Sequence, residues 1–475
     1  MSVGHPISRR AMLASALGAQ SVIRAGAKRP NVLFLFSDDQ QADTIASLGN
    51  PHIRTPHLDS LVRRGVSFTR AHNMGGIAPA VCVASRAMLL TGQTLFRADE
   101  RLTAEVTGRG RKGPFSLLPE YFRSHGYRTF GTGKWHNRAP LFARGFSSGA
   151  NILFGGGSDH YKVPVHDFRP DGDYSAKPDR IETSHSSELF SDSAIRFLRE
   201  HQGPDPFFLY LSYTAPHDPH TAPELYRKAH PPGRMGVPAN FLPEHPFDNG
   251  ELRIRDEMLA PFPRTPGIIQ QYLSHYYAMI SHMDAQIGRV LQALQLSGKA
   301  DDTIIVFSSD NGLAAGQHGL LGKQNLYEHS VRIPLVLSGP GIPRGRRSGA
   351  LCYLLDLFPT LCELCNLPPA EHLEGCSLAP LLLDQNVSVR DSLFFAYRDF
   401  QRGITDGDWK MIRYRTDGPT RLQLFNLSED PLERNNLAAT SAGAGRVAAM
   451  DRQLQDWMAA TGDPMESVER FRSGA

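Results

Sequence analysis

Residues 31–36 read Asn-Val-Leu-Phe-Leu-Phe and are followed at once by Ser37-Asp38-Asp39-Gln40. A continuous apolar run of this length is typical of a β-strand buried on both faces, as the strands of parallel sheets are. Two adjacent carboxylates repel each other and are costly to bury unless a cation lies between them. A solvated loop with two acids is the common alternative, but the buried strand directly before Asp38 disfavours it.

Three further apolar runs are also followed by charged, amide or imidazole groups. The four runs and the groups behind them are residues 31–36 with Asp38 and Asp39, residues 127–130 with Lys134 and His136, residues 207–213 with His217, and residues 303–309 with Asp310 and Asn311. We expect a glycine-rich turn at residues 131–133, where glycine lets the backbone approach an anion closely. Ligand sites in open α/β sheets lie at the carboxyl ends of the strands, so the four groups should meet in space.

The rest of the pattern predicts an α/β fold, with a large, mostly parallel sheet sandwiched by helices. Helical patterns alternate with the strands, at residues 55–65, 115–125, 188–200, 270–296 and 355–364. Long loops are expected at residues 154–187 and 219–266, where glycine, proline and histidine are frequent; loops of this length often shape a substrate pocket. After Asp391, short alternating runs separated by Asp-Gly and Gly-Pro turns predict a small antiparallel sheet, followed by a terminal helix at residues 447–458.

Composition narrows the class of protein. The chain has 475 residues, 41% of them hydrophobic and 21% charged, which suits a large globular core with a smaller lobe. The formal net charge of +3 offers no bulk electrostatic argument for binding nucleic acid. No apolar run approaches the length that a membrane span needs.

The first residues differ in texture from the rest. Ser8-Arg9-Arg10 precedes a modest apolar run, and Ala25-Gly26-Ala27 resembles a signal-peptidase site. This pattern predicts a twin-arginine export signal at residues 1–27 and an exported, periplasmic or extracellular bacterial protein; a disordered basic tail is the alternative. The expected organisation is therefore an export signal at 1–27, a catalytic α/β domain at 28–390 and a C-terminal subdomain at 391–475.

The segment from Pro79 to Gly92 contains Cys82-Val-Ala-Ser-Arg86 at the expected start of a helix that ends at Thr91-Gly92. An arginine and a helix N-terminus both stabilise negative charge, so Cys82 is well placed to act as, or beside, an anionic nucleophile. An isolated Cys-x-x-x-Arg is more often a small buried cysteine beside a surface arginine. Here the four polar strand ends elsewhere in the chain favour the functional interpretation.

The candidate site residues fall into two chemical sets. Asp38, Asp39, Asp310 and Asn311 offer only oxygen ligands, which suits a hard cation such as Ca²⁺ or Mg²⁺ and disfavours zinc. The second set is cationic or imidazole-bearing and would bind a tetrahedral oxyanion; its members are Arg86, Lys134, His136, His217 and Lys323. His318 is a possible additional substrate-binding group, and a loop histidine with a backbone partner is an equal alternative.

Cys82-Val-Ala-Ser-Arg86 with its Leu-Thr-Gly tail resembles the signature of type I sulfatases of the alkaline-phosphatase-like superfamily, in which Cys-x-Pro-x-Arg marks a cysteine that is oxidised to formylglycine. The resemblance extends over nearly all of residues 31–437. Ala84 stands where the family usually has proline, and this departure concerns recognition by the formylglycine-generating maturase more than the later chemistry. Asn311 stands where some members carry histidine, and either side chain can ligate a cation.

The resemblance implies sulfuric ester hydrolysis by a hydrated formylglycine at position 82, with one Ca²⁺ held by Asp38, Asp39, residue 82, Asp310 and Asn311. Arg86 and Lys134 would position the hydrated aldehyde, and His136 would act as the base when the covalent sulfate intermediate collapses. His217 and Lys323 would hold the sulfate and assist the leaving oxygen. The long loops favour a sulfated carbohydrate as substrate, with a choline-sulfatase-like small-ester hydrolase as an alternative.

The sequence also permits three alternative functions. A phosphodiesterase or phosphonate monoester hydrolase would use the same fold and formylglycine, because sulfate monoesters and phosphodiesters carry the same single negative charge. A cysteine-dependent phosphatase would use Cys82 as a thiolate, but that chemistry needs a longer anion-binding loop and no cation. A sulfated-glycan binding module without turnover would result if Cys82 were not matured.

The other four cysteines are Cys352, Cys362, Cys365 and Cys376. Cys362 and Cys365 lie in an apolar helical stretch with no second pair at zinc-site spacing. We expect core packing or a single optional disulfide from these cysteines, and no metal site.

Overall fold

The computed structural model describes residues 29–107, 115–384, 387–416 and 420–466, and the expected export signal at 1–27 lies outside them. Within those ranges, none of the helices combines the length and the apolar character that crossing a membrane requires.

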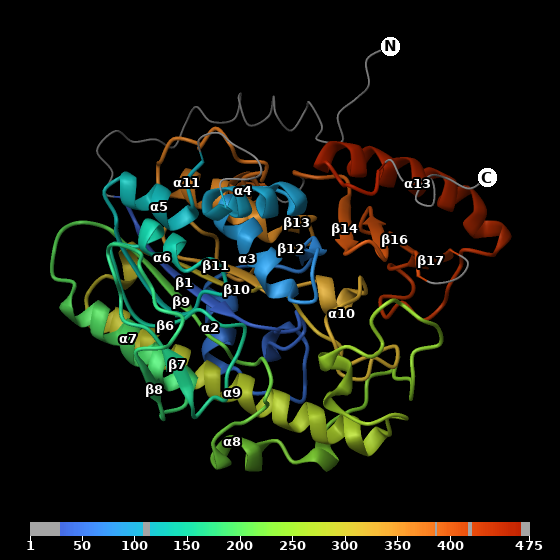
Figure 1. The fold of residues 1–475 in the computed structure, drawn as a ribbon, viewed down its shortest axis with the longest axis horizontal. Coiled ribbons are helices and arrows are strands. Elements are labelled where there is room, and N and C mark those ends of the chain that lie inside the picture. The colour runs from blue at the N-terminus through green and yellow to red at the C-terminus, as the bar shows by residue number, and fades with distance from the viewer. Residues whose placement is uncertain (1–28, 108–114, 385–386, 417–419, 467–475) are drawn as a thin grey trace.

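An eight-stranded sheet forms the centre of the molecule (Figure 1), in the order β12-β2-β11-β10-β1-β9-β5-β6. Its strands are β12 (Arg346–Ser348), β2 (Gly65–Phe68), β11 (Leu335–Ser338), β10 (Thr303–Ser309), β1 (Asn31–Ser37), β9 (Phe207–Ser212), β5 (Arg128–Lys134) and β6 (Ser148–Leu153). Only β11 runs against the others, pairing antiparallel with β10 and β2. Every residue of β1 is buried, which confirms the interpretation of residues 31–36 as a central parallel strand.

Helices cover both faces of this sheet, as the predicted α/β fold requires (Figure 1). Alternate side chains of β1 point to opposite faces, so Phe34 packs in one core cluster and Leu35 in another. The first cluster includes side chains of α3 (Val81–Thr91), α4 (Leu95–Thr107), α5 (Leu118–Ser124) and α11 (Leu357–Leu364). The second includes side chains of α2 (Pro56–Arg64), α7 (Ser186–Glu200) and α9 (Pro266–Leu296).

The expected turn at residues 131–133 is wrong, because β5 continues through both glycines to Lys134. A register shift between Thr132 and Gly133 marks a β-bulge at this point. Gly133 has a φ of +90°, and a Cβ there would overlap the backbone oxygen of Ser212 on β9. The glycine therefore allows two neighbouring strands to approach closely and re-aims Lys134, rather than forming a turn.

A second, five-stranded sheet lies beside the first (Figure 1), in the order β17-β16-β15-β14-β4. Four of its strands form the predicted antiparallel meander: β14 (Leu393–Tyr397), β15 (Gln401–Thr405), β16 (Trp409–Tyr414) and β17 (Arg421–Asn426). The fifth, β4 (Gly75–Gly76), comes from the segment just before Cys82 and pairs in parallel with β14. The terminal helix α13 (Ser441–Thr461) packs on β14 and β15.

Short elements complete the chain. They are β3 (Ala71–His72), β7 (Val163–Val165), β8 (Arg180–Glu182), β13 (Cys352–Tyr353), α6 (Pro140–Gly145), α8 (Glu224–Ala229), α10 (Glu328–Val331) and α12 (Ala379–Leu383). The β7–β8 ribbon and α8 fall inside the two stretches expected to be long loops, and the rest of those stretches is mostly irregular. All five cysteines are free thiols.

Candidate active site

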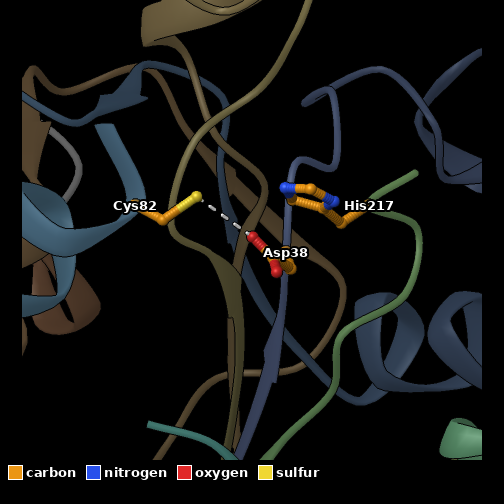
Figure 2. A group of neighbouring side chains, drawn as sticks. All are labelled: Asp38, Cys82 and His217. Carbon is orange, nitrogen blue, oxygen red and sulfur yellow. Dashed lines mark hydrogen bonds between the residues drawn. The ribbon is translucent and has the colours of Figure 1, made fainter. Parts of the chain in front are cut away.

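The polar residues behind β1 and β10 meet at the start of α3, where Cys82 lies in the first turn. Ligand atoms of Asp38, Asp39, Cys82 and Asp310 all lie within 4.8 Å of one another, and all four residues are buried. Figure 2 shows Cys82 and Asp38 pointing toward one another, with the ring of His217 beside Asp38. Parallel pairing of β1 with β10 and β9 brings these segments together, since it aligns their carboxyl ends at one edge of the sheet.

The Cys82 thiol lies between carboxylates and an ammonium group. Its Sγ is 3.3 Å from Asp38 Oδ1 and 3.6 Å from Asp39 Oδ1, and Lys323 Nζ donates to it at 3.0 Å. Burial and the negative charges of Asp310 and Asp38 raise the pKa of the thiol well above its ordinary value. The unmodified side chain is therefore held as a neutral thiol, which disfavours a thiolate nucleophile.

The oxygen-bearing set fits a hard cation. Three carboxylates converge there, and within the described part of the chain no group hydrogen-bonds to Oδ1 of Asn311, although this atom is buried. The amide nitrogen of Asn311 donates to Asp39 and to the Gly312 carbonyl, so its oxygen is left for a further partner. Carboxylate and amide oxygens in this number are the donors that Ca²⁺ and Mg²⁺ prefer.

Two buried lysines neutralise the carboxylates that follow β1. Lys134 Nζ donates to Asp38, and Lys323 Nζ lies 2.7 Å from both carboxylate oxygens of Asp39. Burial by itself raises the pKa of Asp38, but Lys134, His217 and Arg86 outweigh it and hold that pKa well below its ordinary value. Burial disfavours charge on Lys323, but Asp39, Cys82 and Asp38 outweigh it and hold the pKa of its ammonium group well above its ordinary value.

Arg86 is fully buried and supports the site through hydrogen bonds. It donates to Asp310 Oδ2 at 2.9 Å, to the Lys134 carbonyl at 2.8 Å and to Ser212 Oγ at 2.7 Å. Its guanidinium also lies over the Phe36 ring, 5.0 Å from the centroid. Among the described residues none accepts a hydrogen bond from its Nη2. These contacts hold Asp310, of the oxygen-bearing set, and the backbone of Lys134, of the cationic set, in place.

Burial and the positive charges of Lys134 and Arg86 lower the pKa of His136 to about 2. The ring is therefore neutral, and its Nδ1 has no hydrogen-bond partner among the described residues. Gly156 lies against this ring, where a Cβ would come within 2.8 Å of Nε2.

His217 follows β9 and reaches the same carboxylates. Its Nε2 is 3.7 Å from Asp39 Oδ2, and its Nδ1 is 2.8 Å from the backbone oxygen of Asp218. The buried His160 supports the backbone here, since its Nε2 is 3.0 Å from the His217 carbonyl oxygen. Both contacts fix the orientation of His217.

His318 has a different environment. Its ring stacks on Tyr327 with a centroid separation of 4.0 Å, and its Nε2 is 3.2 Å from the amide nitrogen of Asn240. These contacts give the predicted substrate-binding role of His318 no support.

Several supporting side chains were not predicted. Ser85 and Asn73 both donate to the Asp310 carbonyl, and the Tyr276 hydroxyl donates to the Asp39 carbonyl at 2.7 Å. Ser85 sits inside the quoted Cys82–Arg86 stretch, so its position was a usable signal. Tyr276 lies on the apolar face of α9, where the helical pattern indicates only core packing.

Comparison with known families and proteins agrees with this geometry. Residues 30–367 match the family described as Sulfatase, and residues 316–460 match the family described as N-sulphoglucosamine sulphohydrolase, C-terminal. The N-acetylglucosamine-6-O-sulfatase of Bacteroides thetaiotaomicron is 25% identical, over 90% of this chain and 86% of that protein. The ulvan-active sulfatase of Formosa agariphila is 27% identical, over 93% and 84% of the two chains.

Two solved structures share the fold. One is a complex with its substrate D-glucosamine-2-N,6-O-disulfate, with a TM-score of 0.77, 23% identity and coverage of 93% of this chain and 100% of that one. The other is the phosphonate monoester hydrolase of Agrobacterium radiobacter, with a TM-score of 0.72, 25% identity and coverage of 91% and 96%.

Proposed function

This chain belongs to the sulfatase family, and from that premise we propose that it hydrolyses the sulfate ester of a sulfated carbohydrate with a nucleophile made from Cys82. The observation that carries the proposal is the position of Cys82 Sγ, 3.3 Å from an Asp38 carboxylate and 3.0 Å from the Lys323 ammonium. The sulfated sugars that appear in the names of its relatives support the substrate class. An export signal at residues 1–27 would bring the enzyme to such substrates outside the cytoplasm.

We propose that a formylglycine-generating maturase oxidises Cys82, and that the hydrated aldehyde supplies the nucleophilic oxygen. The raised pKa of the thiol supports this, because an unmodified Cys82 would attack poorly. A nucleophile at this position is held at the start of α3 by a helix that ends cleanly at Gly92, where φ is +64°. Its direction of attack is thus set by rigid secondary structure.

The residues that would hold Ca²⁺ are Asp38, Asp39, Asp310 and Asn311, together with residue 82. When bound, the cation would polarise a sulfate oxygen and favour ionisation of the nucleophile. Arg86 and Lys134 hydrogen-bond to Asp310 and Asp38 and so orient these carboxylates for this task. The unpartnered Oδ1 of Asn311 is the direct structural support for a ligand in this position.

The cationic residues bind and orient the sulfate group in this proposal. Lys134 forms an ion pair with Asp38, and Lys323 forms one with Asp39. Their ammonium groups would therefore lie beside the reacting position at residue 82. His217, fixed through its Nδ1, presents Nε2 to the same space and would give a proton to the leaving oxygen. His136, whose Nδ1 has no hydrogen-bond partner among the described residues, would take the proton of the second hydroxyl when sulfate is released.

A second candidate function is hydrolysis of phosphonate monoesters or phosphodiesters, which the fold shared with the Agrobacterium enzyme supports. The two activities separate in one comparison. Enzyme co-produced with a maturase is assayed for sulfate release from a panel of sulfated monosaccharides and an aryl sulfate, and for cleavage of the matched aryl phosphodiester. We expect a higher kcat/KM for the sulfates, and a preference for the diester would reject the proposal. Mass analysis of the Cys82 peptide then identifies aldehyde or thiol.

Metal removal is the independent test of the cation site. Chelation is expected to abolish turnover, because the buried carboxylates would be left to repel each other, and added Ca²⁺ should restore it. Free Ca²⁺ at about a hundred times its Kd should raise the free energy of unfolding by about 2.7 kcal/mol. In Asp310→Asn, Ca²⁺ should no longer raise the free energy of unfolding. Full activity of the wild type in chelator would contradict the assignment of a cation site.

A further inference from the structure

The loop that carries Lys323 is held by hydrogen bonds from a segment of the proline-rich stretch at residues 219–266. That segment spans residues 255–264 and begins with a short 3₁₀ helix, η3 (Arg255–Leu259). Two of its buried residues, Glu257 and Arg264, form an ion pair in which Arg264 Nη2 lies 2.7 Å from Glu257 Oε2. Neither residue contacts Cys82 or the carboxylates around it in any hydrogen bond described above.

The ion pair holds the backbone of the loop at both ends. Glu257 accepts hydrogen bonds from the backbone N–H of Leu321 at 2.9 Å and of Gly322 at 2.7 Å. Arg264 donates to the carbonyl of Gly319 through its Nη1. The two backbone N–H groups directly before Lys323 are therefore fixed by one buried carboxylate.

Two glycines of the loop, Gly322 and Gly319, allow other segments to approach it closely. A Cβ on Gly322 would lie 2.9 Å from Glu257 Oε1, and one on Gly319 would overlap the backbone of Glu244 and His245. Gly319 also has a φ of +73°, which side chains rarely adopt. Gly322 therefore allows the close approach of residues 255–264, and Gly319 allows that of residues 244–245.

Asp256 adds a contact on the other side of Lys323. Its Oδ2 accepts from Gln324 Nε2 at 2.7 Å, and Gln324 Oε1 in turn accepts from the Lys323 backbone N–H at 3.0 Å. The N–H groups of three successive residues, Leu321, Gly322 and Lys323, are all satisfied by side chains that this segment provides or orients. Lys323 Nζ, at the end of the loop, lies 2.7 Å from both oxygens of Asp39.

We propose that Glu257 is a positioning residue for Lys323: through the N–H groups of Leu321 and Gly322 it fixes the loop so that the Lys323 ammonium meets the reacting position beside Cys82. This inference rests on the role of Lys323 in the proposed function. A purely structural role is the alternative, since a buried ion pair stabilises a fold wherever its partners are well oriented. The bidentate Arg402–Asp463 pair offers a matched control, because it is equally buried and lies in the C-terminal lobe.

The test compares Glu257→Gln with Asp463→Asn. Glu257→Gln keeps the shape but replaces one acceptor oxygen with an NH₂ group, so one backbone N–H loses its partner. We expect kcat per folded enzyme to fall about 10- to 100-fold with KM changed less than about threefold, because a displacement of about 1 Å costs that much. Asp463→Asn should lower the melting temperature and leave kcat within about twofold. Equal kcat in both variants and wild type would overturn the proposal.

Two further measurements separate positioning from general damage. In a Lys323→Ala background, Glu257→Gln should cause no additional loss of kcat, because residues that act through one another are not additive; a multiplicative loss would contradict the proposal. Gly322→Ala would place a Cβ against Glu257 and so disturb the same contact. This variant should reproduce the kcat defect and replaces Glu257→Gln if that variant fails to fold.

A crystal structure of either folded variant makes the result independent of turnover. We expect Lys323 Nζ to be displaced by about 1 Å or more from its wild-type position, and an unchanged Lys323 would refute the positioning role. If the wild type hydrolyses no sulfate ester at all, the proposed function fails, and this structural comparison still decides the positioning of Lys323.

Discussion

Two regions of this protein bury charges of both signs, and they differ in what the charges surround. Around Cys82, carboxylates from β1 and β10 meet two lysines, while Oδ1 of Asn311 and Nη2 of Arg86 have no partner among the described residues. At the seam with the small sheet, Lys410 Nζ lies 2.9 Å from Glu328 and 3.1 Å from Glu433. Buried charge alone therefore does not identify an active site.

The seam cluster behaves like a structural joint. Glu433 accepts the backbone N–H of Glu328 at 2.7 Å, and His72 lies 3.2 Å from the Glu328 carboxylate. Its charges thus link α10, β16 and β3 of the two lobes. In the Cys82 cluster the charges instead surround one side chain, that of Cys82, and the unpartnered Oδ1 of Asn311 is available to a ligand. The contrast predicts that one cluster governs turnover and the other governs stability.

The largest effect is expected from Cys82→Ala. Loss of the nucleophile should reduce sulfate release by about 10⁴-fold or more, since removing a covalent nucleophile typically costs this much. The free energy of unfolding should change by about 1 kcal/mol or less, because alanine keeps the helix and removes only one small side-chain atom. Urea denaturation alongside the activity assay measures both; residual turnover above a hundredth of wild type would break the contrast.

Lys410→Met should produce the reverse pattern. Removing the ammonium leaves Glu433 and Glu328 buried without their shared cation, which should lower the free energy of unfolding by about 3–5 kcal/mol. Turnover per folded molecule should stay near that of wild type. The same two assays serve, and a kcat loss as large as that of Cys82→Ala would show that the seam takes part in catalysis.

Asp284 gives the smallest effect and extends the contrast to a buried carboxylate without a cation. It accepts the backbone N–H groups of His57 and Leu58 at the start of α2, and burial raises its pKa to about 7. A folded-state pKa above the ordinary 3.8 means that the folded state binds the proton more tightly. Stability contributed by protonated Asp284 is therefore present at low pH and is lost as pH rises from about 4 to 7.

Asp284→Asn removes this titration. The difference in unfolding free energy between wild type and variant should shift by about 4 kcal/mol across that pH window, because the pKa is raised by about three units and each unit corresponds to about 1.4 kcal/mol. Urea denaturation at several pH values measures it. A difference that stays constant with pH would mean that the two helical N–H groups keep Asp284 ionised throughout.

Much of the fold could be predicted from the sequence because its strands are unusually plain. The run from Asn31 to Phe36 is apolar at nearly every position, and β10 begins and ends where the pattern predicts. The glycines at 131 and 133 were predicted wrongly as a turn, because Gly131 is required by the rings of Phe142 and Phe146 and Gly133 by the backbone of Ser212, and no local pattern reveals these contacts. For the same reason β4 could not be predicted: two glycines become a strand only by pairing with β14.

The candidate site divides in a similar way. Residue type and position after a buried strand were enough to nominate Asp38, Asp310 and Lys134, and the structure brings them together. His318 was nominated by residue type alone, and its ring stacks on Tyr327. Lys323 lies in the same loop and reaches Asp39, so the local sequence did not determine which of these two side chains meets the site.

By itself the sequence determined the periodicity of the strands and helices, the kinds of groups placed at their ends, and the Cys82–Arg86 signature, because these depend on residues close together in the chain. Only the tertiary structure decided which charges pair, which atoms remain unpartnered, and that Glu257 grips the loop before Lys323. Those outcomes depend on distances between segments separated by tens to hundreds of residues, and such distances are set by packing of the whole core.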